Sequence, residues 1–332
     1  MRLNNLIRIS SVALLLLLCK AANADAISSP KHDFFNALRL GGYSSAGITA
    51  PRNDDAKAAI NEISLILTWE NESRFKFFSE LELEKPLLWD KNNHFNSKKS
   101  YLDLERLYLD YNFSDQINLR TGRFLTPSGR WNELHAAPLV WTSSRPLATS
   151  RLFPTAANGL MVFGATKALE YAMFIEALQD QNDDDDEIKY NNVKGGRIRF
   201  GQESSVGLNL MSFNEKVISH PSYRMLGVDF ITHYKNIEFS GEAFQRWDVR
   251  DQDGGSGAYV QAAIPLPFAQ NWTGITRIEN LHRPDEGHHQ RWLIGTTWHV
   301  KPTQLLKLEF TGGSGDLPES PRGFLASFAV LF

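Results

Sequence analysis

Four arginines lie in or just before the longest stretch between two predicted strands: Arg123, Arg130, Arg145 and Arg151. A guanidinium group is always charged and offers a planar fork of donors, so clustered arginines favour anions and phosphate-like solutes. Acidic side chains recur earlier in the chain: Glu80, Glu82, Asp103 and Glu105. Charges of both signs across a narrow space can sort ions, or they can simply neutralise each other. The sequence leaves both interpretations open.

The stretch that carries these arginines runs from Thr126 to about Asn158 and has a formal net charge of +2. It contains Trp131, Trp141 and Phe153, although disordered segments are poor in large apolar residues. Long connections without regular structure are usually functional or disordered. We therefore expect this segment to bury itself against the rest of the protein, either to narrow a passage or to cap it with an apolar cluster.

The elements that position these residues read as short strands separated by turn residues, with no run long enough for a membrane-spanning helix. Sixteen strands are predicted, an even number: Ala37–Ile48, Ala59–Glu70, Arg74–Glu84, Tyr101–Phe113, Gln116–Leu125, Gly159–Thr166, Leu169–Leu178, Val193–Gly201, Ser205–Phe213, Tyr223–Tyr234, Ile237–Val249, Gly257–Ile264, Trp272–Leu281, Gln290–Val300, Gln304–Thr311 and Gly323–Phe332.

Alternation within the strands separates an apolar face from a charged one. In the third predicted strand, Phe75 and Phe77 share one face, whereas Lys76 and Glu80 share the other. The alternation slips by one residue at Glu105-Arg106, which predicts a β-bulge. Strands with an apolar and a charged face are typical of a transmembrane antiparallel β-barrel around a water-filled lumen. The stretch from Thr126 to about Asn158 would be its third long external loop and would fold into that lumen.

Short and long connections alternate along the chain, as they do in outer-membrane barrels with tight periplasmic turns and long external loops. The acidic run Asp183–Glu187 falls in the fourth long connection. It is predicted to be a solvated external loop; the alternative is contact with lipopolysaccharide through divalent cations.

The two ends of the chain indicate export. Residues 1–24 combine a positive start, an apolar stretch and Ala22-Asn23-Ala24, which predicts a cleaved signal peptide, and a lipoprotein signal ending at Cys19 is the alternative. Residues 25–332 would then form one barrel domain without cysteine. The last strand ends on Phe332 and has an alternating apolar face, as expected for a strand that closes a barrel in lipid near Leu38 and Leu40.

The run Arg120–Gly129 resembles the basic-x-Gly-basic-Phe-x-x-Pro-x-Gly stretch of Gram-negative porins, most of all the phosphate-selective porin family. The strand count, the long third loop and the terminal phenylalanine are similar to the wider porin superfamily. The resemblance implies a channel in the outer membrane, a homotrimer, and recognition of the last strand by the barrel-assembly machinery. Its partners would be outer-membrane lipid, lipopolysaccharide and small hydrophilic solutes, anionic ones included.

No phosphate-binding glycine loop, H-E-x-x-H or G-x-S-x-G is present. We therefore expect no cofactor, metal, enzymatic activity or nucleic-acid partner. Two rival functions remain open at this point. A barrel enzyme that hydrolyses lipids or esters would need a serine and a histidine in contact at the lipid-facing rim, and a structural or adhesive barrel would have a plugged lumen that conducts no ions.

Overall fold

The computed structural model describes residues 35–332 except 93, 180–187, 217–220, 316 and 318–319. The predicted signal peptide, residues 1–24, and the acidic run Asp183–Glu187 lie outside the described residues. The chain divides into two compact units, Met1–Ala37 and Leu38–Phe332, and the second unit holds every strand described below.

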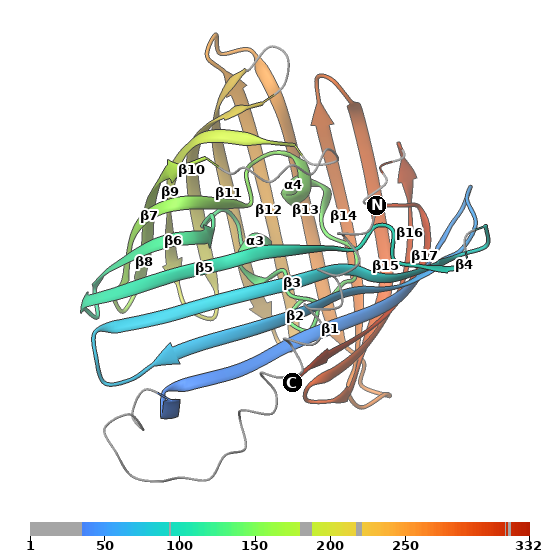
Figure 1. Ribbon diagram of the computed structural model, residues 1–332. Coiled ribbons are helices and arrows are strands. Elements are labelled where there is room, and N and C mark those ends of the chain that lie inside the picture. The colour runs from blue at the N-terminus through green and yellow to red at the C-terminus, as the bar shows by residue number, and fades with distance from the viewer. Residues whose placement is uncertain (1–34, 93, 180–187, 217–220, 316, 318–319) are drawn as a thin grey trace, which may run out of the picture. The chain divides into compact units, whose positions relative to one another are not determined.

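One antiparallel sheet of 17 strands makes up this second unit (Figure 1). The strands are β1 (Leu38–Pro51), β2 (Lys57–Glu70), β3 (Phe75–Asp90), β4 (His94–Asn96), β5 (Tyr101–Ser114), β6 (Ile117–Leu125), β7 (Ala156–Ala165), β8 (Leu169–Leu178), β9 (Tyr190–Gly201), β10 (Ser205–Glu215), β11 (Ser222–Tyr234), β12 (Ile237–Asp248), β13 (Asp253–Pro265), β14 (Trp272–Arg283), β15 (Gly287–Lys301), β16 (Gln304–Ser314) and β17 (Gly323–Leu331).

The sheet closes on itself because β1 pairs with both β2 and β17. The short strand β4 pairs only with the end of β3 and was not predicted, so 16 strands form the barrel wall, which confirms the predicted count and fold class. Closure is staggered: Phe332 exchanges backbone hydrogen bonds with Gly42, and not with the expected region near Leu38 and Leu40. A closed barrel requires such a stagger between its first and last strands.

The predicted bulge in β5 is confirmed. In the pairing with β3, Glu80 lies opposite Arg106 and Leu81 lies opposite Leu104, so Glu105 has no partner in the register. The extra residue restores the alternation on both sides of it.

The outer surface of the barrel is apolar. In β10, Val206, Leu208 and Leu210 are exposed, while the residues between them are buried. The same alternation exposes Phe324 and Phe328 in β17. An apolar surface that runs around a closed sheet is suited to lipid. None of the described helices has the length and apolar character needed to cross a membrane.

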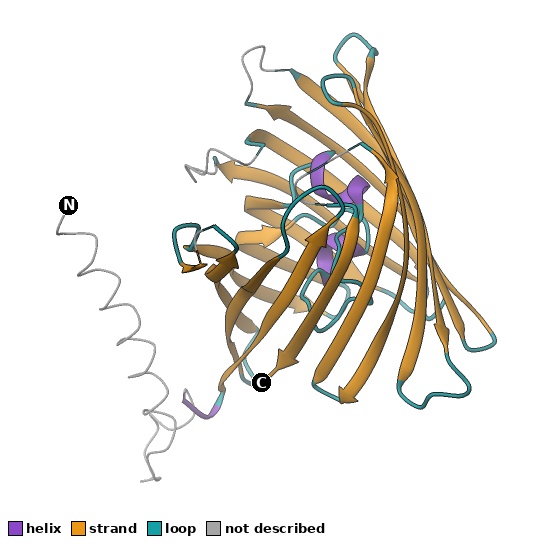
Figure 2. Ribbon diagram, turned by 90° about the vertical axis from the view of Figure 1, so that its right-hand side faces the viewer, coloured by secondary structure: helices purple, strands orange, loops and turns teal. Residues whose placement is uncertain are grey.

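Two short helices lie within the ring of strands, α3 (Trp131–Leu134) and α4 (Leu147–Arg151) (Figures 1 and 2). Both belong to the third loop, residues 126–155, which connects β6 to β7. Leu147, Leu152 and Phe153 are almost completely buried in one apolar cluster with inward-facing residues such as Phe213 and Phe244. Much of the lumen beside β6–β14 is therefore filled by side chains.

Candidate functional site

The third loop starts near a glycine whose backbone conformation and close packing leave no room for a side chain. Gly129 has φ +71°, and a Cβ there would come 1.9 Å from Glu242 Oε2. Glycine is the residue that allows this conformation and this close approach. Arg120 makes a bidentate ion pair with Asp110 at 2.8 and 2.9 Å, and its guanidinium lies 3.7 Å from the ring centre of Tyr108. The porin-like run Arg120–Gly129 thus sets where the loop leaves the wall.

Three inward-facing carboxylates of β12, β14 and β16 hold the loop by accepting its backbone N–H groups. We call them the anchor carboxylates: Glu242, Glu279 and Glu309. Glu242 accepts from the backbone nitrogens of Arg130 and Trp131 at 3.1 and 2.7 Å. The N–H of Leu147 donates to Glu279 at 2.6 Å.

Glu309, the third anchor carboxylate, accepts from the backbone N–H groups of Ser143 and Ser144 and from the Ser144 hydroxyl, the last at 2.8 Å. Hydrogen bonds to an ionised acceptor are about twice as strong as neutral ones, so these contacts fix the path of the loop.

Two buried cations of the wall also bind the loop. Arg277 donates to the hydroxyls of Thr142 and Ser144, both at 2.9 Å, and lies 3.2 Å from Glu279. The ammonium group of Lys307 donates to the carbonyls of Ala137 and Thr142 at 2.6 and 3.2 Å. Each positive charge is thereby directed at loop oxygens.

A cavity of about 410 Å³ separates the loop from the opposite side of the barrel. We call it the loop–wall cavity. On the loop side, its lining includes Trp131, His135, Ser143 and Arg145. On the wall side, the acidic residues of β2, β3 and β5 form what we call the acidic wall: Glu62, Glu82, Glu84, Asp103 and Glu105.

Half of the predicted site residues line this cavity. Arg145, Glu82, Asp103 and Glu105 are among its lining residues. The cavity lining does not include the other four, Arg123, Arg130, Arg151 and Glu80.

These other residues have structural partners. Arg151 forms an ion pair with Glu286 at 2.7 Å, Glu80 is fully buried against Arg106 at 2.5 Å, and Arg130 contributes its backbone N–H to Glu242. Arg123 lies in β6 opposite Leu107 of β5.

Arg145 is turned toward its own loop. Its guanidinium donates to Asn132 Oδ1 and to the Thr149 carbonyl, both at 3.0 Å. His135 lies 3.4 Å from Glu105, and burial together with the Arg145 charge lowers the pKa of His135 to about 4. The imidazole is therefore neutral near pH 7.

Sequence reasoning missed Glu62, Glu84 and the anchor carboxylates. The alternation of apolar and charged residues in β2 and β3 could have indicated Glu62 and Glu84, because both fall on the charged face of their strands. No local pattern distinguishes an anchor carboxylate from an acidic-wall residue, since the difference is made by a loop distant in sequence.

Comparisons with known proteins agree with this architecture. No protein-family model matches the chain. A protein of Aquifex aeolicus (strain VF5), described as an uncharacterized protein, is 32% identical over 142 residues. That alignment covers 42% of this chain and 31% of the relative, so the match spans about a third of the relative's length.

Solved structures show the same fold at low sequence identity. The trimer form of OmpT, an outer membrane protein of Vibrio cholerae, superimposes with a TM-score of 0.63 at 8% identity, covering 89% of this chain and 99% of that one. The chain shares the closed antiparallel β-barrel fold of this protein. An anion-selective porin from Comamonas acidovorans gives 0.60 at 12% identity, over 89% and 98% of the two chains. Salmonella typhi OmpF, in complex with daunomycin, gives 0.63 at 9% identity, over 89% and 97%.

Proposed function

We propose that this protein is an outer-membrane porin that lets small hydrophilic solutes diffuse through the loop–wall cavity. The observation that carries this proposal is a polar-lined space of about 410 Å³ between the third loop and the acidic wall, inside a barrel with an apolar outer surface. Such a barrel keeps its edges paired and its interior wet. The porin fold supports the proposal.

The constriction is held in place by the wall. Three anchor carboxylates and two buried cations bind the loop from β12 to β16, so solutes pass on the opposite side. Pore width is then set by how far the loop extends from its anchors toward β2, β3 and β5. A passage of fixed width needs no cofactor and no chemical step.

Location and assembly belong to the same proposal. Residues 1–24 would direct export and be removed, the last strand would be recognised by the barrel-assembly machinery, and lipid and lipopolysaccharide would surround the apolar surface. A homotrimer is proposed because one similar structure, OmpT of Vibrio cholerae, is a trimer. The specific resemblance to phosphate-selective porins stays a prediction.

A hydrolytic function has less support. The lumen-facing candidates for a triad, Asp229, His233 and Ser240, have other environments: Asp229 accepts from Arg197 at 2.5 Å and from Asn209 at 3.1 Å, and His233 lies 3.8 Å from Glu238. A triad needs a carboxylate directed at its histidine, whereas Asp229 is engaged by Arg197 and Asn209. We therefore propose a channel without enzymatic activity.

Planar-bilayer recording of the purified, folded protein tests the proposal. Ohmic current steps are expected, and silence from folded protein would contradict a channel and favour a plugged barrel. The predicted mature chain has no cysteine, so Asp103→Cys places one thiol in the cavity lining. A bulky thiol reagent should reduce the step of this variant. The matched control is Glu203→Cys, in the short turn between β9 and β10, where the same reagent should leave the current unchanged.

A further inference from the structure

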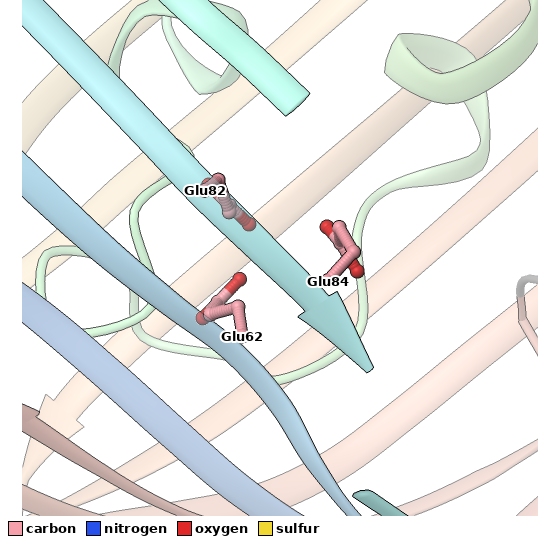
Figure 3. Close-up of side chains that lie close together, drawn as sticks. All are labelled: Glu62, Glu82 and Glu84. Carbon is pink, nitrogen blue, oxygen red and sulfur yellow. The ribbon is translucent and has the colours of Figure 1, made fainter. Parts of the chain in front are cut away.

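The two faces of the loop–wall cavity carry different kinds of charge. Its lining holds five carboxyl groups, all on the acidic wall, and two basic side chains, Arg145 and Lys307. Figure 3 shows Glu62 of β2 beside Glu82 and Glu84 of β3. One carboxylate oxygen from each lies within 4.8 Å of the others. Carboxyl groups this close oppose one another's ionisation, so the cluster carries fewer than three negative charges, and the charge that it does carry faces the cavity.

The hydrogen-bond donors to this group are neutral. Ser45 donates its hydroxyl to Glu62 at 2.9 Å, and Tyr43 donates its hydroxyl to Glu82 at 3.2 Å. These contacts orient the carboxyl groups and add no positive charge to the cluster. Three cations outside the cavity lining act on the acidic wall: Lys85 on Glu84, and Arg123 and Arg106 on Glu105.

The cations that do line the cavity are engaged with the loop. Lys307 is almost completely buried and donates to two loop carbonyls, and Arg145 donates to Asn132 and Thr149. Their hydrogen bonds point their donors toward loop oxygens, whereas the acidic wall faces the open space. A cleft lined by one sign of charge and bounded by low-dielectric walls concentrates counterions of the other sign.

We propose that the acidic wall makes this passage prefer small cations and cationic solutes over anions. The inference rests on the proposed channel function and reverses the preference that the loop arginines suggested. The carboxylates act as a lining along which mobile cations exchange, as acidic rings do in cation channels, and not as a fixed coordination site. Arg145 and Lys307 keep the loop in place, and the carboxylates across from it set the sign of the permeating ion.

Reversal potentials in a KCl gradient test this inference separately from the channel itself. The wild-type protein should show a reversal potential of the sign set by K⁺. The triple variant Glu62→Gln, Glu82→Gln, Glu84→Gln should lower the K⁺/Cl⁻ permeability ratio by about fivefold or more at low salt, where screening is weakest.

A matched control removes the same number of charges from the short turns at the other rim, through Glu72→Gln, Asp115→Asn and Glu203→Gln. It should keep the wild-type ratio within about twofold, because none of these three residues lines the cavity. Should the triple variant fail to fold, the single variant Glu62→Gln must still lower the ratio.

Each result decides one claim. Current steps with an anion-preferring or neutral wild-type reversal potential would overturn the cation preference and leave the channel intact. Equal ratios in the wild-type protein and the triple variant would also overturn it. Absence of current from folded wild-type protein would overturn the proposed function, and the cation preference with it.

Discussion

The wall from β12 to β16 and the wall from β2 to β5 use the same residue type for different purposes. Glu242, Glu279 and Glu309 meet backbone N–H groups of the third loop, and their charge fixes that loop. Glu62 and Glu82 receive hydroxyl donors and face open space. A glutamate on the inner face of the barrel therefore holds the loop where the loop covers it, and acts on mobile ions where it faces open space.

The largest expected difference between the two walls is in stability. Arg277 is fully buried and links Thr142, Ser144 and Glu279, so Arg277→Ala leaves a buried carboxylate without its cation. We expect a loss of about 3–5 kcal/mol in the free energy of unfolding. Glu62→Gln on the acidic wall removes one of several like charges and keeps an oxygen acceptor for Ser45, so it should cost less than about 1 kcal/mol. Urea unfolding of both variants in lipid measures the two losses in the free energy of unfolding. Equal losses would contradict the difference between the two walls.

A smaller effect is expected where the loop leaves the wall. Gly129→Ala places a methyl group at φ +71° and 1.9 Å from Glu242 Oε2, so the loop must shift. The strain should cost about 1–3 kcal/mol and change the size of the single-channel step. The control is Gly287→Ala, at φ +85° with nothing within 4 Å of the added carbon, which tests backbone strain without the clash. An unchanged step in Gly129→Ala would mean that Glu242 does not position the loop.

Weakening one anchor should be milder still. Glu309→Gln keeps an oxygen acceptor for Ser143 or Ser144 but removes the charge that strengthens both hydrogen bonds. The expected cost is about 1–2 kcal/mol, with noisier open-channel current because the loop fluctuates more. Current noise as low as that of the wild-type protein would show that the remaining anchors suffice.

The last effect is absent at neutral pH and develops only on acidification. The pKa of His135 is lowered to about 4 from its ordinary 6.5, so the folded protein binds this proton less readily than the unfolded chain. Between these two values, stability contributed by His135 should fall as the pH falls, and it should be fully present above 6.5. The imidazole resonances of the folded protein should titrate near pH 4, with His135→Gln as the assignment control. Titration near 6.5 would contradict the buried position of the ring.

Strand positions and faces could be predicted because each strand has one lipid-facing and one lumen-facing side, and alternation records both. The bulge at Glu105 was predictable for the same reason, since one extra residue interrupts the pattern. The three-residue strand β4 was too short to show any alternation.

The site was predicted less well, because the role of a lumen charge depends on contacts between residues distant in sequence. Arg145 reaches back to Asn132, and Arg151 pairs with Glu286 across the chain. The sequence shows that these arginines are near one another, but it does not show which oxygens they meet. The same limit hid the anchors, because Glu309 lies far along the chain from Ser143.

The central claim is that the acidic wall sets ion preference and the anchor carboxylates set pore width. Recording the step size and reversal potential of Glu62→Gln and Glu309→Gln in the same bilayer system tests it most directly. The account predicts that Glu62→Gln lowers the preference for K⁺ and leaves the step almost unchanged, whereas Glu309→Gln alters the step and its noise but not the sign of the preference. Both variants changing the same quantity would contradict the division of roles between the two walls.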